Sequence, residues 1–243
     1  VSDIPEYADA FRAAYPAITA PDQITFADVS NALATFIEHE WRSDTSPFDA
    51  YLRTQTPLPP LAIDGLTLFY GDAGCSTCHA GPFQTDHSFH AMGDVQIGPG
   101  KARRFETHAR DVGRFGVTGD LADLYAFRTP SLRNVAMTGP YGHAGAFADL
   151  GTYVAAHANG TGLSAYDLAN AVLPKTPFDD LRIMQDDIER TAISDARVTM
   201  PQLSDDDVVR LVAFLNALTD PVAQTGRLGI PGAVPSGLDI PNP

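Results

Sequence analysis

Apolar residues recur at helical spacing in a few segments of the chain, and alternation typical of strands is scarce. The clearest helix is predicted over 205–218, where one face is apolar. Ser204 precedes it as an N-cap, and the three aspartates that follow suit the positive end of a helix dipole. The apolar face of this helix consists of Val208, Leu211, Val212, Leu215 and Leu218. The pattern therefore predicts a helix that packs on one side and is solvated on the other.

A second amphipathic helix is predicted over 25–42, with Thr25 as N-cap and Asp28 at the third helical position. Its apolar face contains Phe26, Val29, Leu33, Phe36 and Ile37. Further helices are predicted over 5–15, 62–72 and 147–158, with one or two more within 164–193.

Proline and glycine divide the chain into three parts. Prolines near 47 and from 57 to 60 separate a helical arm, 1–60, from a main domain, 61–220. Residues 81–145 are rich in Gly, Pro, Thr and Asp and predict long loops. The tail, 221–243, is expected to be extended and to dock on another part of the protein or be disordered. We therefore expect a mostly α fold with long loops.

Composition and charge narrow the possible partners. The chain has 243 residues, of which 44% are hydrophobic and 19% charged, and a net charge of −14. This charge disfavours nucleic acid and anionic membrane surfaces as partners, because both are negatively charged. No apolar run approaches the roughly 20 residues that cross a bilayer. The chain begins with Val1 rather than Met, which we interpret as a processed or trimmed N-terminus.

The two cysteines of the chain lie in the motif Gly74-Cys75-Ser76-Thr77-Cys78-His79. Such a CxxCH motif is typical of c-type haem, whose two vinyl groups react with the thiols while the histidine binds the iron. A redox dithiol and a structural metal site are the alternatives. The first lacks a βαβ context, and the second usually needs four ligands. We therefore expect one covalent haem c, with Cys75, Cys78 and His79 holding it, and a periplasmic location.

Several segments resemble the bacterial di-haem cytochrome c peroxidase and MauG family. Residues 75–90 resemble the second haem motif of that family, and residues 5–52 resemble the segment that joins its two haem domains. Further matching segments are 111–114, 117–120, 127–134, 138–147 and 213–219. The resemblance implies a cytochrome c-like haem domain preceded by the linking arm.

The chain also departs from this family. Members have two CxxCH motifs, and the N-terminal haem domain with the first motif is missing here, as is the tryptophan between the haems. Trp41 lies in the arm and is expected to be a packing residue. The chain is therefore a C-terminal portion, a subunit or a mono-haem relative. In the family, the helix at 25–42 packs on the missing domain, which favours the first two.

The resemblance places the distal iron ligand at His157. Leu150, Val154 and His157 are spaced i, i+4 and i+7, so the imidazole shares the apolar face of a helix. The alternatives are a histidine with no ligand role, or Met137 as the ligand. Two bound imidazoles would leave iron no open position, so this haem would relay electrons rather than react with peroxide.

Other residues acquire roles through the resemblance. His143 is expected near the haem propionates. Three arginines could bind propionates or pair with surface carboxylates instead: Arg114, Arg128 and Arg133. The backbone carbonyls of Thr138 and Pro140 match calcium ligands of relatives. Asp86 and His90 match family positions and are expected to be structural. The remaining histidines are expected to be solvated: His39, His87 and His108.

Three functions remain open. The first is the haem domain of a peroxidase that reduces hydrogen peroxide with electrons from a small redox protein. The second is a MauG-like enzyme that oxidises side chains of a protein substrate, and the third is a mono-haem electron-transfer cytochrome. Residues 160–200 exceed the family pattern, and we predict that this insertion, which includes Tyr166, Met184 and Met200, covers a haem edge or a partner site.

Overall fold

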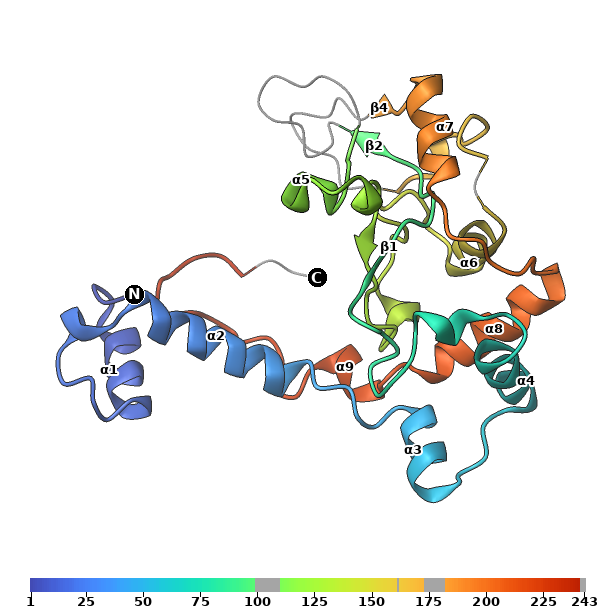
Figure 1. Cartoon of the computed structure of the whole chain (residues 1–243). Coiled ribbons are helices and arrows are strands. Elements are labelled where there is room, and N and C mark those ends of the chain that lie inside the picture. The colour runs from blue at the N-terminus through green and yellow to red at the C-terminus, as the bar shows by residue number, and fades with distance from the viewer. Residues whose placement is uncertain (99–109, 161, 173–181, 241–243) are drawn as a thin grey trace. The chain divides into compact units, whose positions relative to one another are not determined.

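The computed structural model describes residues 1–98, 110–160, 162–172 and 182–240. The chain forms two compact units (Figure 1): Val1–Asp44 with Pro221–Pro243, and Thr45–Asp220. Residues 45–60, assigned above to the arm, lie in the second unit. Helices predominate, which confirms the mostly α prediction. Within the described ranges, no helix combines the length and apolarity needed to cross a membrane.

The second unit is built around the packing of α4 (Pro60–Tyr70) against α8 (Asp205–Ala217). Ser204 caps α8 as predicted, because its hydroxyl accepts a hydrogen bond from the Asp207 amide while the Asp207 side chain bonds back to the cap residue. Phe214 of α8 is fully buried, with its ring centroid 5.2 Å from that of Phe48 and 5.1 Å from that of Phe69. This aromatic cluster fixes the helix that leads into the CxxCH motif.

Among its described residues, the second unit contains four further α-helices. They are α3 (Pro47–Thr54), α5 (Phe115–Thr118), α6 (Leu150–Asn159) and α7 (Asp187–Asp195). Two short antiparallel ladders pair β1 (Phe89–His90) with β3 (Phe127–Arg128) and β2 (Ile97–Gly98) with β4 (Arg182–Ile183). The register pairs Phe89 with Arg128 and Ile97 with Ile183.

Some helices begin at other residues than the sequence predicted, because a capping residue sets where the helix starts. The helix expected from 147 begins at Leu150, because the Asp149 carboxylate accepts a hydrogen bond from the Thr152 amide and ends the preceding loop. Of the helical stretch expected at 164–193, the described part contains a single 3₁₀ turn, Leu168–Asn170, and α7. Residues 173–181 lie outside the described residues, as does His108.

The first unit contains α1 (Pro5–Ala14), α2 (Phe26–Glu40) and α9 (Pro221–Thr225). Thr25 caps α2 with Asp28, as predicted. Most of the apolar face of α2 is exposed to solvent, with exposed fractions of 88% for Phe26 and 58% for Leu33. Trp41 is 63% exposed, so it is not packed within the described part of this chain, and its expected packing role stays a prediction.

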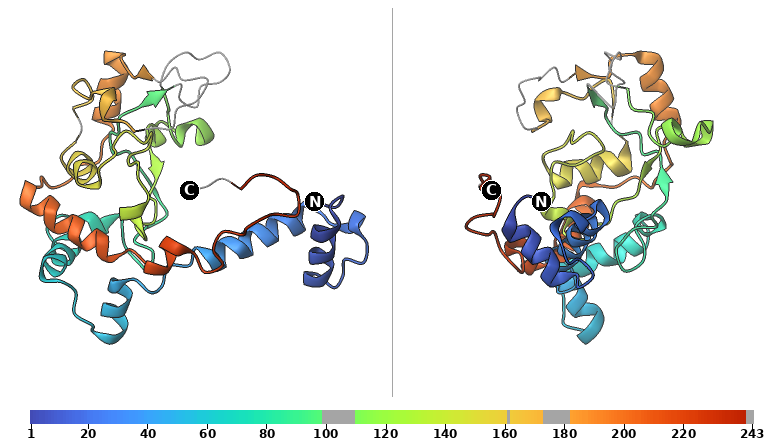
Figure 2. Two further views of the ribbon diagram at one scale, coloured as in Figure 1. Left: turned by 180° about the vertical axis from the view of Figure 1, so that it is seen from behind. Right: turned by 90° about the vertical axis from the view of Figure 1, so that its left-hand side faces the viewer.

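The C-terminal tail docks within the first unit. Arg227 donates hydrogen bonds to the backbone carbonyls of His39 and Arg42, and the Leu228 amide donates to the buried Glu40 carboxylate. Figure 1 and the left-hand view of Figure 2 show the first part of the tail running beside α2. The last turn of α2 offers carbonyls that no helical amide satisfies, and Arg227 supplies donors to that end.

Candidate functional site

The CxxCH motif forms one wall of a cavity of about 380 Å³. Gly74, with φ of +68°, starts a 3₁₀ turn at Cys75–Thr77, and this turn places Cys75, Cys78 and His79 on that wall. Both thiols are free and half-buried, and burial raises the pKa of Cys75 to about 11. The rest of the wall is largely apolar and includes Phe69, Leu150, Val154, Leu211 and Leu215.

Two imidazoles face this cavity. The Nδ1 atom of His79 lies 3.1 Å from the Gln84 carbonyl oxygen, so Nδ1 carries the proton and Nε2 is left free. Burial lowers the pKa of His79 to about 4 and also lowers the pKa of His157. The ring centroids of His79 and His157 are 6.3 Å apart, with the ring planes at 54°. Both rings are therefore neutral at pH 7 and able to bind a metal.

The spacing of the rings provides a test of haem binding. A metal–imidazole bond is about 2.0 Å long and the nitrogen lies roughly 1.1 Å from its ring centroid, so two imidazoles that held one metal from opposite sides would have centroids about 6.2 Å apart. The observed separation of 6.3 Å is close to this value. Two thiols, two imidazoles and an apolar cavity thus fit a c-type haem.

The methionines that line the cavity are not Met137, the one considered above as an iron ligand. Met137, the alternative to His157, is 60% exposed and does not line the cavity. Met92 and Met200 do line it. Met200 belongs to the 160–200 insertion, so part of this insertion reaches the cavity. Met92 lies in an irregular loop, where no spacing in the sequence marks a residue as cavity-lining.

Five further residues singled out above also line the cavity: His90, Arg128, Thr138, Pro140 and His143. The His143 Nε2 atom is 2.9 Å from the Asp111 carboxylate, and its ring stacks on Phe127 with centroids 3.5 Å apart. The Arg128 guanidinium lies 2.9 Å from His87 Nδ1, and His87 itself is exposed, as His39 is. His143 and Arg128 thus present polar groups at a largely apolar cavity.

Arg114 and Arg133 do not line the cavity. Arg133 forms a 2.6 Å ion pair with Asp49, in which the carboxylate is buried and the Arg133 side chain half-buried, and donates to the Pro82 carbonyl. Arg114 pairs with Asp123 at 3.1 Å and lies over the Phe89 ring. The sequence left two roles open for these arginines, propionate binding or an ion pair with a carboxylate. In the structure both form an ion pair with a carboxylate. For Arg133 the carboxylate of that pair is buried rather than on the surface.

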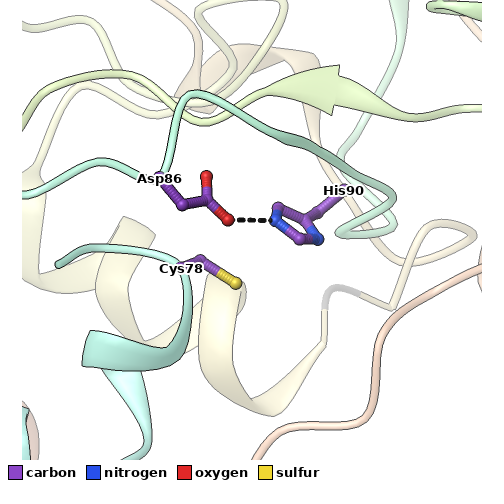
Figure 3. Close-up of side chains that lie close together, drawn as sticks. All are labelled: Cys78, Asp86 and His90. Carbon is purple, nitrogen blue, oxygen red and sulfur yellow. Dashed lines mark hydrogen bonds and ion pairs between the residues drawn. The ribbon is translucent and has the colours of Figure 1, made fainter.

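A second group of potential metal ligands shares a cysteine with the haem motif. Ligand atoms of Cys78, Asp86 and His90 all lie within 4.8 Å of one another (Figure 3). A thioether at Cys78 would consume that sulfur, so haem attachment and a three-ligand metal site exclude each other. The Asp86–His90 pair, 2.8 Å long, remains in either case.

Sequence reasoning missed Tyr153 and Asp94, which also line the cavity. The Tyr153 hydroxyl lies 3.1 Å from His157 Nδ1 and donates to the Asp94 carboxylate at 3.5 Å. The i, i+4 spacing of Tyr153 and His157 could have suggested the first contact. Asp94 is 59 positions from Tyr153, and no local pattern connects them.

Comparisons with known proteins agree with this geometry. The profile of the di-haem cytochrome c peroxidase family matches residues 1–57. Cytochrome c551 peroxidase of Pseudomonas aeruginosa is 36% identical over 220 residues, which are 90% of this chain and 51% of that protein. The chain belongs to the di-haem cytochrome c peroxidase and MauG family. The resemblance inferred from the sequence motifs is thereby confirmed.

Other members of the family match as well. The methylamine utilization protein MauG of Methylorubrum extorquens is 36% identical over 148 residues, which are 60% of this chain and 38% of that protein. The crystal structure of a MauG-like protein associated with microbial copper homeostasis superposes with a TM-score of 0.60 and 27% identity, covering 83% of this chain and 59% of that one. The chain spans about half the length of the curated relatives it matches.

Proposed function

We propose that the chain is the c-type haem unit of a peroxidase-class oxidoreductase and exchanges electrons with a second haem, where hydrogen peroxide reacts. Cys75 and Cys78 bind one haem covalently, His79 is the proximal ligand and His157 the distal ligand. The observation that carries the proposal is the facing pair of neutral imidazoles, 6.3 Å apart, beside two free thiols. A haem held there supplies one-electron redox chemistry.

The residues of this chain then exclude peroxide and tune the electron relay. His79 and His157 would hold the iron from both sides, which would leave no coordination site for peroxide. Two imidazoles also stabilise the oxidised centre more than a methionine ligand does. His143 and Arg128 offer donors to the propionates at the polar part of the cavity.

The remaining parts of the proposal concern partners. The exposed apolar face of α2 supports an N-terminal haem domain or subunit as the covering partner, because such a face is stabilised by burial. Thr138 and Pro140 provide backbone carbonyls to a calcium ion shared with that partner. Haem c is attached outside the cytoplasm, so we place the protein in the periplasm, where a small redox protein donates electrons.

A MauG-like reaction is the second candidate. The 36% identity to MauG and the superposition on a MauG-like protein favour it. In that case the haem unit withdraws electrons from a protein substrate instead of accepting them from a redox protein. Steady-state peroxide consumption with a ferrocytochrome donor distinguishes the two, because only the first candidate sustains it.

The decisive experiment is ferric absorption and EPR spectroscopy of the haem-loaded chain. We expect a low-spin spectrum that becomes high-spin in His157→Ala and stays low-spin in the controls Met137→Leu and His90→Ala. We also expect one haem per chain by pyridine haemochrome analysis. A His157→Ala spectrum that stays low-spin, or rapid peroxide turnover by the wild-type chain alone, would overturn the proposal.

A further inference from the structure

A short hydrogen-bonded chain leads away from the distal imidazole. Tyr153 lies one helical turn before His157 on α6, and its hydroxyl oxygen is 3.1 Å from His157 Nδ1. The same hydroxyl donates to the Asp94 carboxylate at 3.5 Å. A phenol has one proton and an ionised carboxylate has none, so the proton between Tyr153 and His157 must come from Nδ1. His157 therefore presents its unprotonated Nε2 atom as the free ligand nitrogen.

The aromatic residues around Tyr153 hold its ring in place. Tyr141 stacks on it at a centroid distance of 6.2 Å and an interplanar angle of 13°, and Phe147 packs at 5.5 Å. The Tyr153 hydroxyl lies between the Asp94 carboxylate and His157 Nδ1. The hydroxyl thus has a fixed position and a fixed donor role toward Asp94.

Arg197 contacts both segments that supply the hydrogen bonds between His157, Tyr153 and Asp94. Its guanidinium donates to the backbone carbonyls of His157 and Ala158 at the end of α6. Its aliphatic part lies against Gly93, where an added Cβ would be 3.0 Å from the Arg197 Cδ atom. Gly93 directly precedes Asp94, so one side chain holds both the ligand helix and the loop that supplies the carboxylate. The positively charged guanidinium of Arg197 therefore lies against the backbone carbonyl of His157.

We infer that Tyr153 and Asp94 are positioning residues for the distal haem ligand: they hold the tautomer and orientation of His157 and increase its electron donation to the iron. Hydrogen bonding from a ligand imidazole to a carboxylate-terminated chain makes the imidazole more basic. A more basic ligand stabilises the oxidised iron and lowers the reduction potential. This inference rests on the proposed ligation by His157 and assigns the tuning of that ligand to Tyr153 and Asp94.

The experiment measures the midpoint potential and the low-spin ferric EPR spectrum of the haem-loaded chain. Tyr153→Phe keeps the aromatic packing and removes the hydroxyl. We expect a shift of the ferric–ferrous equilibrium of about tenfold toward ferrous iron, which corresponds to about 59 mV for one electron. The spectrum should remain low-spin with altered g values. Tyr166→Phe is the matched control, because Tyr166 also packs on Phe147 but bonds to the Ala146 carbonyl. It should leave both readouts unchanged.

A double-mutant cycle tests whether Asp94 acts through Tyr153. Asp94→Asn alone should also raise the potential, and Asp94→Asn in the Tyr153→Phe background should add almost nothing. Additive shifts of the midpoint potential would overturn the inferred hydrogen-bond path from Asp94 through Tyr153 to His157, because they would mean that Asp94 acts on the haem only through space. An unchanged potential in a low-spin Tyr153→Phe protein would overturn the inference but leave His157 as ligand. A His157→Ala protein that stays low-spin would instead overturn the ligation itself.

Discussion

The close approach of α4 and α8 depends on Gly65, and its replacement by alanine is the sharpest test of the packing that holds the haem motif. A Cβ built at Gly65 would lie 1.9 Å from the carbonyl oxygen of Arg210 and 2.6 Å from its carbonyl carbon. It would also lie 3.0 Å from the Phe214 Cβ atom. The obstacle is mainly backbone, so no side-chain rotation can relieve it, and the two helices must separate.

The magnitude follows from two opposing effects. Overpacking a well-packed core costs about 3 kcal/mol when the backbone must shift. Replacing glycine by alanine inside a helix gains about 1 kcal/mol in intrinsic helix propensity. We therefore expect Gly65→Ala to lower the free energy of unfolding by at least about 2 kcal/mol. For a unit of the size of Thr45–Asp220 this lowers Tm by about 4–8 °C.

Thermal and urea unfolding of the haem-loaded protein, monitored by circular dichroism and by the Soret band, measure this effect. Gly116→Ala is the matched control. It also lies in a helix, α5, and its added Cβ would make one ordinary contact, 3.6 Å from Val112. We expect that control to be neutral or slightly stabilising. Equal stability of the Gly65 and Gly116 variants would refute the argument, because it would mean that α4 and α8 do not approach as closely as described.

Two further predictions concern ion pairs near the haem motif. Burial raises the pKa of Asp86, but hydrogen bonds, first among them the one with His90, outweigh burial and lower it from 3.8 to about 2. The stabilisation is therefore complete above pH 4 and is lost as pH falls toward 2, so urea midpoints should decrease over this window more in wild type than in Asp86→Asn. Arg133→Met leaves the buried Asp49 carboxylate without an ion-pair partner and should cost about 3 kcal/mol in urea unfolding, with only partial recovery on adding Asp49→Leu, which removes the acceptor of the Ser46 amide and hydroxyl. A change in haem potential in Arg133→Met would contradict the assignment of this arginine to Asp49.

Much of the site was predictable because its chemistry is local in sequence. The spacing of Cys75, Cys78 and His79 requires no knowledge of the fold, since the three residues lie within five positions. Helix starts at Thr25 and Ser204 were equally predictable, because a cap bonds to an amide three residues away. The place of His157 came from matching the family motifs, and the structure then brings its ring opposite His79.

Other features depend on contacts between residues far apart in the chain. The sequence left Arg133 with two roles, and only the fold places it beside Asp49, 84 positions away. Trp41 was expected to be packed because it lies in the linking arm, yet it is exposed within this chain.

The sequence by itself predicted the family of the protein, the residues proposed to attach a c-type haem and most helix positions, because these follow from covalent chemistry and from contacts within one or two helical turns. Only the tertiary structure decided which polar groups surround the two imidazoles. The chain from His157 through Tyr153 to Asp94 joins a helix to a loop 59 positions earlier, and such a contact exists only once both segments pack against the same cavity.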